Sequence, residues 1–294
     1  MMYKTPFLFL VLVLFSRCTT NHSSTPAVQF PALAEAGNAA DTLIVREELS
    51  SHFSACNAHV EGSITVYDHN KGVWILSDSA DAYKETLPAS TFKIINLLIA
   101  LEEGVIRDEN EIMRWPGKTD TTLYGYRPDI YRDMTVKEAF EVSAVWAFLD
   151  LANRIGKDKY AQYLRASGYG NGNIREAGED FWNFGTFGIS PVNQVQFMKN
   201  VYEGKTPFSK RNIDILKRVM LTETADAYSI SAKTGWTREG GINVGWWVGY
   251  VEREQQLYFF ATRLMQDRRY NSPDFAPCRK EITKAVLREM QLIP

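Results

Sequence analysis

Pro88-Ala89-Ser90-Thr91-Phe92-Lys93 leads directly into the mostly apolar run Ile94–Leu101. Positions i and i+3 share one face of a helix, so the amine of Lys93 can reach the hydroxyl of Ser90. A serine hydroxyl is a weak nucleophile until a neighbouring base takes its proton. The apolar run predicts that Lys93 is buried, and burial lowers the pKa of an amine, which makes it a base. The stretch therefore predicts a nucleophile and its base at the start of a buried helix.

Two further motifs follow in the same chain. Ser143–Val145 (Ser-Ala-Val) stands at a predicted helix start, and Lys233–Gly235 (Lys-Thr-Gly) ends a predicted strand. The lysine and threonine of the second motif offer a cation and a hydroxyl to a carboxylate, and its glycine lets the backbone approach a ligand closely. Ser-x-x-Lys alone occurs by chance in many chains. The three motifs in this order are those of serine enzymes that form acyl intermediates with penicillins.

From about Asn57 to the C-terminus, the sequence resembles the class D β-lactamases, the oxacillinase type. Ser143–Val145 matches the Ser-x-Val of that family, whereas class A enzymes and most penicillin-binding proteins carry Ser-x-Asn. The other segments that match the family are Pro88–Lys93, Tyr169–Asn171, Phe181-Trp182, Lys233–Gly235, Gly245–Tyr250 and Arg279.

The resemblance implies a mechanism with a role for each residue. Ser90 attacks the lactam carbonyl and carries the acyl group. Lys93 takes up carbon dioxide, becomes N6-carboxylysine and acts as the general base. The backbone N–H groups of Ser90 and Trp236 form the oxyanion hole. Ser143, assisted by Lys233, passes a proton to the leaving nitrogen.

The same resemblance implies the surroundings of these groups. The residues that bind the substrate carboxylate are Thr234, Gly235 and Arg279. The residues that form the pocket around the carboxylated lysine are Val145, Trp182 and Asn183. The indole N–H of Trp182 would donate to the carbamate. Where Asn183 stands, the family usually has a leucine, and a polar residue there would open the pocket and change the dependence on bicarbonate.

Each of these residues also has a purely structural interpretation. Taken alone, Lys93 would be a solvated helix lysine and Ser143 a helix cap. Trp182 and Trp236 would be core aromatics, and Arg279 a surface arginine. The functional interpretation rests on the whole set of motifs.

The order of expected elements predicts the fold class. The expected strands are residues 63–68, 73–76, 228–233, 245–251 and 256–263. The signals from residue 90 to about 196 are mostly helical, with helical spacing at 139–155 and 157–166 and a further helix at 191–202, and the last expected helix is 279–292. This order predicts an α+β fold of the β-lactamase/transpeptidase type, with an antiparallel sheet flanked by helices and an all-helical subdomain. In the single domain 41–294, the mixed part would be about 41–88 and 210–294, and the helical part about 89–209.

The N-terminus predicts export. Lys4, an apolar run and small residues up to Cys18 are typical of a signal peptide, residues 1–18. The apolar run is too short to span a bilayer. Residues 19–40, rich in Ser, Thr, Pro and Ala, predict a flexible leader. The expected location is the periplasm, and a loose likeness to a lipobox leaves open a lipid anchor through Cys18, the one route by which the chain would meet a membrane.

Composition adds exclusions. A formal net charge of −2 gives no reason to expect nucleic acid as a partner. The four histidines and three cysteines match no metal pattern, so no metal is expected, and no cofactor beyond carbon dioxide or bicarbonate. Cys56 and Cys278 are either bridged or two buried thiols. The expected partner is a small-molecule β-lactam, and the chain is a monomer or a homodimer.

Two rivals share the motifs. A penicillin-sensing receptor domain is acylated without turnover, but such sensors carry transmembrane helices before this domain, and here only a signal peptide is predicted. A D-alanyl-D-alanine peptidase would carry Ser-x-Asn in place of Ser143–Val145. The sequence therefore predicts a class D serine β-lactamase that confers antibiotic resistance.

Overall fold

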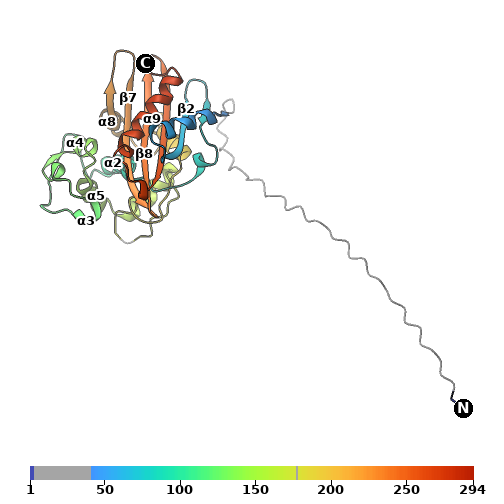
Figure 1. The fold of residues 1–294 in the computed structure, drawn as a ribbon. Coiled ribbons are helices and arrows are strands. Elements are labelled where there is room, and N and C mark those ends of the chain that lie inside the picture. Colours follow the sequence, from blue (N-terminus) through green and yellow to red (C-terminus); the bar gives the residue numbers. More distant parts are fainter. Residues whose placement is uncertain (3–40, 177) are drawn as a thin grey trace. The chain divides into compact units, whose positions relative to one another are not determined.

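The computed structural model describes residues 1–2, 41–176 and 178–294, and Ala40–Pro294 forms one compact unit (Figure 1). The predicted signal peptide, the leader and Cys18 lie outside the described residues. In the part of the chain that the structure describes, no helix has both the length and the apolar composition needed to cross a membrane.

A seven-stranded sheet forms the centre of this unit, in the order β1-β3-β2-β9-β8-β7-β6. Its strands are β1 (Thr42–Val45), β2 (Glu61–Asp68), β3 (Val73–Leu76), β6 (Leu221–Thr224), β7 (Ser229–Glu239), β8 (Ile242–Arg253) and β9 (Gln256–Asp267). All neighbours pair antiparallel except β1 and β3, which are parallel. The expected hairpin is β2–β3. The sequence did not predict the two edge strands, β1 and β6, or the parallel pairing of β1 with β3.

Helices cover both faces of the sheet. On one face lie α1 (Ser51–Cys56) and α9 (Phe275–Glu289). The helices between β3 and β6 are α2 (Lys93–Glu102), α3 (Thr121–Tyr124), α4 (Val136–Glu141), α5 (Val145–Ile155), α6 (Lys157–Ser167), α7 (Pro191–Tyr202) and α8 (Lys210–Met220). A small second sheet pairs β4 (Ile112–Met113) with β5 (Met134–Thr135). Figure 1 shows α9 over β8, with α3, α4 and α5 grouped to one side of the sheet.

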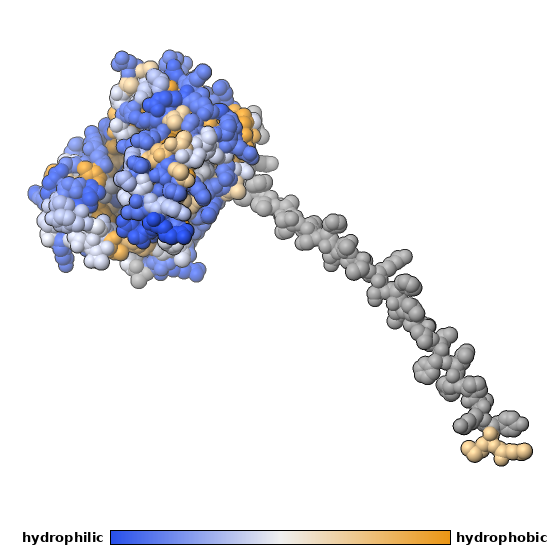
Figure 2. Space-filling view, viewed as in Figure 1, coloured by the Kyte–Doolittle hydropathy of each residue, from blue (hydrophilic) through white to orange (hydrophobic). Residues whose placement is uncertain are grey.

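Strand alternation builds two cores, because successive side chains of a strand point to opposite faces. In β8, Trp246 and Val248 enter the core that contains the helical insert, whereas Trp247 and Val251 enter the core under α1 and α9. The helix α2 lies inside the first core, and every residue from Lys93 to Leu101 is buried. A helix with no exposed face is expected at the centre of a domain. The face of the molecule seen in Figure 2 is mostly hydrophilic.

Two predicted helix boundaries are wrong. Residues 139–155 are not one helix: α4 ends at Glu141 and α5 begins at Val145, because Ser143 has φ 61° and leaves the right-handed helical region. The last helix begins at Phe275 instead of Arg279, so Arg279 lies in its second turn.

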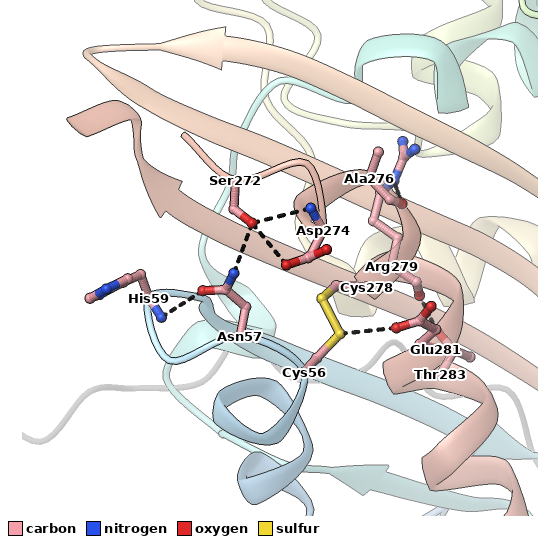
Figure 3. The surroundings of a disulfide bond; sticks show 10 residues. All are labelled: Cys56, Asn57, His59, Ser272, Asp274, Ala276, Cys278, Arg279, Glu281 and Thr283. Atoms are coloured by element: carbon pink, nitrogen blue, oxygen red, sulfur yellow. Dashed lines mark hydrogen bonds between the residues drawn. A yellow bond between two sulfur atoms is a disulfide. The ribbon is translucent and has the colours of Figure 1, made fainter. Parts of the chain in front are cut away.

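Cys56 and Cys278 form a disulfide between the end of α1 and the first turns of α9 (Figure 3). This outcome settles the choice between a bridge and two free thiols. Beside the bridge, the Asn57 amide donates to the Ser272 hydroxyl at 3.0 Å, which ties the same turn to the loop before α9. The N-terminal part of α9 is therefore fastened to α1 at two neighbouring points.

Candidate active site

Ser90 lies in a tight turn, the 3₁₀ helix η3 (Ala89–Phe92), directly before α2. Ala89 has φ 51°, a left-handed conformation that residues with a Cβ seldom adopt. Its backbone N–H donates to the carbonyl of Trp182 at 3.1 Å. Lys93 opens α2, and its Nζ donates to Ser90 Oγ at 3.1 Å. The turn thus places the hydroxyl against the amine, as the i, i+3 spacing predicts.

Lys93 is almost fully buried, with 1% of its surface exposed. Its Nζ lies 5.1 Å from the centre of the Phe148 ring. Burial lowers the pKa of Lys93 to about 8, against a smaller opposing effect of the negative charge of Asp180. Among the described residues, no carboxylate lies within 4 Å of this amine. An amine with this pKa is partly neutral at neutral pH, and its neutral form can act as a base.

A second lysine and serine meet opposite this pair. Lys233 Nζ donates to Ser143 Oγ at 2.8 Å and to the Thr234 carbonyl at 3.0 Å. Ser143 has a left-handed backbone conformation between α4 and α5, with φ 61°. Burial holds the pKa of Lys233 well below its ordinary value, and the nearby positive charge of Lys93 lowers it further. The pair is therefore able to pass a proton.

Gly235 brings β7 against the turn that carries the nucleophile. A Cβ at this position would lie 2.8 Å from the carbonyl oxygen of Pro88 and 3.2 Å from the methyl group of Thr91. Real Cβ atoms do not approach a backbone oxygen so closely, so a larger residue would push β7 away from η3. The close approach that the sequence predicted for a ligand is, in the folded protein, an approach to the nucleophile turn.

Arg279 presents a cation without a carboxylate partner. Its Nη1 donates to the Gly235 carbonyl at 2.7 Å and its Nε to the Ala276 carbonyl at 2.8 Å. Burial lowers the pKa of Arg279 to about 10. No ion pair joins it to an acidic group in residues 41–176 and 178–294. A half-buried guanidinium without a counter-ion fits a ligand carboxylate.

These groups border one cleft of about 500 Å³. The sequence-predicted residues that line it are Ser90, Ser143, Val145, Asn183, Thr234, Gly235, Trp236 and Arg279. Lys93, Lys233 and Trp182 are not among the lining residues, because they lie buried behind it. The remaining walls include the aromatic residues Tyr124, Tyr126 and Phe184 and the basic residues Arg127 and Arg238.

Trp182 carries an unused hydrogen-bond donor inside the protein. Its ring stacks on Phe92 with the ring centres 4.8 Å apart, and the residue is fully buried. Its Nε1 has no hydrogen-bond partner among the described residues. A buried polar atom without a partner costs about 1–3 kcal/mol, so such an atom calls for an acceptor that the bare chain lacks.

The comparisons with known proteins agree with this geometry. The family model of the penicillin binding protein transpeptidase domain matches residues 58–287. The chain is 39% identical to β-lactamase OXA-10 of Pseudomonas aeruginosa over 220 aligned residues. The alignment covers 74% of this chain and 79% of that protein. It is 34% identical over 246 residues to β-lactamase OXA-48 of Klebsiella pneumoniae, which covers 83% and 88%. The crystal structure of a class D β-lactamase from Sebaldella termitidis superposes with a TM-score of 0.81 at 36% identity, over 87% of this chain and 100% of that one.

The chain belongs to the class D β-lactamases. The sequence-based predictions of the family, of the β-lactamase/transpeptidase-like fold and of a serine β-lactamase active in antibiotic resistance are confirmed.

Two residues of this class D β-lactamase escaped the sequence analysis. Asp180 and Tyr124 meet beside the cleft, with the Tyr124 hydroxyl donating to a carboxylate oxygen of Asp180 at 2.5 Å. The amide of Asn183 donates to the other carboxylate oxygen at 2.7 Å. The unusual polar residue at 183 is therefore paired with an acid three positions earlier. The spacing of Asp180 and Asn183, one helical turn apart, was the one signal that the sequence offered.

Proposed function

We propose that this class D β-lactamase uses an N6-carboxylated Lys93 as the general base in both half-reactions. The observation that carries the proposal is the buried indole N–H of Trp182, which has no hydrogen-bond partner among the described residues. Its ring stacks on Phe92, the residue directly before the buried Lys93, whose pKa is lowered to about 8. At pH 7, roughly a tenth of such an amine is neutral, and below the pKa this neutral fraction falls about tenfold for each unit by which the pH is lowered. The donor on Trp182 suits a carbamate oxygen.

Carboxylation needs only carbon dioxide. The neutral Nζ of Lys93 forms a bond to the carbon of carbon dioxide and then releases one proton to solvent. No other residue is consumed, and the step is reversible. Val145 and Asn183 border the cleft in front of the amine, so they control how water and carbon dioxide reach it.

In acylation, Ser90 Oγ gives its proton to the carboxylated Lys93 and attacks the lactam carbonyl. The backbone N–H groups of Ser90 and Trp236 stabilise the oxyanion, a contribution of a few kcal/mol per donor in other hydrolases. The lactam C–N bond then breaks, and Ser143 passes a proton to the ring nitrogen with the help of Lys233, which lies 2.8 Å away.

Before deacylation, the proton that the carboxylated Lys93 took from Ser90 passes on to Ser143 and Lys233, which gave a proton to the ring nitrogen. In deacylation, the carboxylated Lys93 takes a proton from water, the resulting hydroxide attacks the ester, and Lys93 returns this proton to Ser90 Oγ as the ester bond breaks. Thr234, Gly235 and Arg279 hold the substrate carboxylate throughout. The unpaired guanidinium of Arg279 on the cleft wall supports this role.

The proposal extends to the setting of the enzyme. Residues 1–18 act as a signal peptide, residues 19–40 as a leader, and residues 41–294 as the single catalytic domain in the periplasm. A lipid anchor through Cys18 is the one membrane attachment under this proposal. The enzyme works as a monomer or homodimer without metal.

Nitrocefin hydrolysis at varied bicarbonate tests the mechanism. After removal of carbon dioxide at low pH, we expect slow turnover that recovers on addition of bicarbonate, and a carbamate resonance on Lys93 when ¹³C-bicarbonate is supplied. Turnover that is independent of bicarbonate would exclude the carbamate as base. A single stoichiometric burst with a stable acyl-protein would favour a penicillin sensor.

A further inference from the structure

Asp180 is a half-buried acid without a cationic partner. Its carboxylate accepts the hydroxyl of Tyr124 at 2.5 Å and the amide of Asn183 at 2.7 Å. No lysine or arginine of the described residues lies within 4 Å of it. Burial raises the pKa of Asp180, whereas the two hydrogen bonds and the positive charge of Lys93 act in the opposite direction.

The turn that carries Asp180 is hydrogen-bonded both to the nucleophile turn η3 and to β7. The Trp182 carbonyl accepts the N–H of Ala89 at 3.1 Å, one residue before the nucleophile. The Asn183 carbonyl accepts the hydroxyl of Thr237, on β7, at 3.0 Å. The rings of Tyr124 and Phe184 lie 6.0 Å apart, which adds a contact across α3. These contacts hold the carboxylate in one place relative to α2.

Lys93 is the complementary half of this arrangement. It is buried, it has no carboxylate within ion-pair distance, and Asp180 is the acid whose charge reaches it. The other charged group that faces Lys93 is Lys233 on β7, and its nearest polar neighbour, Ser90, is neutral. The Trp182 carbonyl, two residues after Asp180, accepts the Ala89 N–H, and the Trp182 ring stacks on Phe92, so the turn of Asp180 packs against the segment that carries Lys93. Inside a protein, charges that are not in contact still interact because the effective dielectric constant is lower than that of water.

Carboxylation reverses the sign of this interaction. Lys93 changes from an ammonium with charge +1 to a carbamate with charge −1. The attraction between Asp180 and the ammonium is lost, and a repulsion between two anions replaces it. Both changes favour the uncarboxylated lysine.

We infer that Asp180 is a positioning residue that opposes the carboxylation of Lys93 and thereby sets the bicarbonate concentration that the enzyme requires. This inference rests on the proposed carbamate mechanism and assigns a role to a residue outside the substrate site. The enzyme is then tuned to environments rich in bicarbonate, and at low bicarbonate it rests with Lys93 as an ammonium facing Asp180.

Titration of the carbamate by ¹³C NMR in ¹³C-bicarbonate tests the inference on the full chain. The variant is Asp180→Asn, which removes the charge and keeps an acceptor for Tyr124. Tyr124→Phe is the matched control, because it removes a hydrogen bond from the same carboxylate and leaves the charge. If Asp180→Asn does not yield folded protein, Asp180→Ser removes the same charge from a smaller side chain.

We expect Asp180→Asn to lower the half-saturating bicarbonate concentration about tenfold at pH 7, the effect of one unit of pKa. Tyr124→Phe should stay within about twofold of the wild type. An unchanged or higher half-saturating concentration in Asp180→Asn would overturn the inference, and so would an equal shift in Tyr124→Phe, which would point to loop order instead of charge. A carbamate resonance missing from the wild type and every variant, with hydrolysis intact, would instead overturn the proposed base.

Discussion

Substitution of Trp182 gives the most direct test of the proposed carbamate on Lys93. We predict that Trp182→Phe raises the half-saturating bicarbonate concentration about tenfold or more, since a hydrogen bond to a charged group contributes about 1.5–3 kcal/mol. The phenyl ring keeps the stacking on Phe92, whose centre is 4.8 Å away. The measurement is nitrocefin turnover as a function of bicarbonate.

Trp246→Phe provides the matched control for this prediction. Trp246 is also fully buried, but its indole N–H already donates to the carbonyl of Leu87 at 2.9 Å. Its replacement should lower stability without changing the bicarbonate dependence. Equal bicarbonate curves for Trp182→Phe and the wild type would remove the main support for a carbamate at Lys93.

Asn183 is the second residue-scale test. We predict that Asn183→Leu lowers the half-saturating bicarbonate concentration and slows the loss of activity after dilution into buffer free of carbon dioxide. A leucine covers the lysine with an apolar group, and it also removes the amide hydrogen bond to Asp180. Asn183→Ala separates the two effects, because it removes the amide without adding cover. If Asn183→Leu behaves as the wild type with and without bicarbonate, Asn183 does not influence the bicarbonate dependence and this prediction is wrong.

At the scale of elements, the disulfide fixes the helix that carries Arg279. The bridge joins α1 to α9 across 222 residues of sequence, and Arg279 directly follows Cys278 (Figure 3). Closing so long a loop lowers the entropy of the unfolded chain by an amount worth up to about 5 kcal/mol in the chain-entropy model, with measured values typically about 2–4 kcal/mol. The double variant Cys56→Ser/Cys278→Ser should therefore unfold at a lower urea concentration.

The same variant should bind substrate less well. Because the Arg279 guanidinium is held by the Gly235 and Ala276 carbonyls, loosening the start of α9 is expected to raise KM a few-fold and to leave kcat nearly unchanged. Treatment of the wild type with a phosphine reductant should reproduce both effects, and the variant should not respond to it. A fall in kcat with constant KM would show that the bridge acts on the nucleophile turn instead.

How much the sequence predicts depends on the distance along the chain between the partners. The contact of Ser90 with Lys93 follows from helical spacing. The contact of Ser143 with Lys233 joins residues 90 positions apart, and only the resemblance to a family anticipated it. The contact of Tyr124 with Asp180 joins residues 56 positions apart, and neither helical spacing nor the family resemblance predicted it. The end of α4 at Glu141 was missed, because apolar spacing continues through residues 139–155 although the backbone leaves the helical region at Ser143.

At the scale of the whole molecule, the described fold begins at Asp41. The Asp41 carboxylate accepts from the Tyr67 hydroxyl at 3.0 Å and from the Trp74 indole at 3.2 Å, and it lies 3.5 Å from the Lys199 amine. Directly after it, β1 pairs in parallel with β3 and closes one edge of the sheet. Residues 41–45 thus provide a hydrogen-bond acceptor for side chains of β2 and β3, an ion-pair partner for α7 and backbone pairing for β3.

This arrangement predicts a sharp boundary for truncation. A chain that begins at Asp41 should keep the melting temperature and nitrocefin turnover of the full-length protein, because it retains every strand, both cores and the cleft lining that the structure describes. A chain that begins at Arg46 loses β1 and leaves the Trp74 indole without its acceptor, which costs about 2 kcal/mol. For a domain of this size, that loss lowers the melting temperature by roughly 4–8 °C.

The two truncations differ by five residues, so their comparison isolates Asp41 and β1 from everything that precedes them. In the chain that begins at Asp41, the substitution Asp41→Asn removes the charge beside Lys199 and keeps the strand, and we expect a smaller loss than deletion of residues 41–45. Calorimetry and turnover of the three proteins give the answer. If removal of residues 1–40 alone lowers the melting temperature as much as removal of residues 1–45, the catalytic unit begins before residue 41, and the boundary drawn here is wrong.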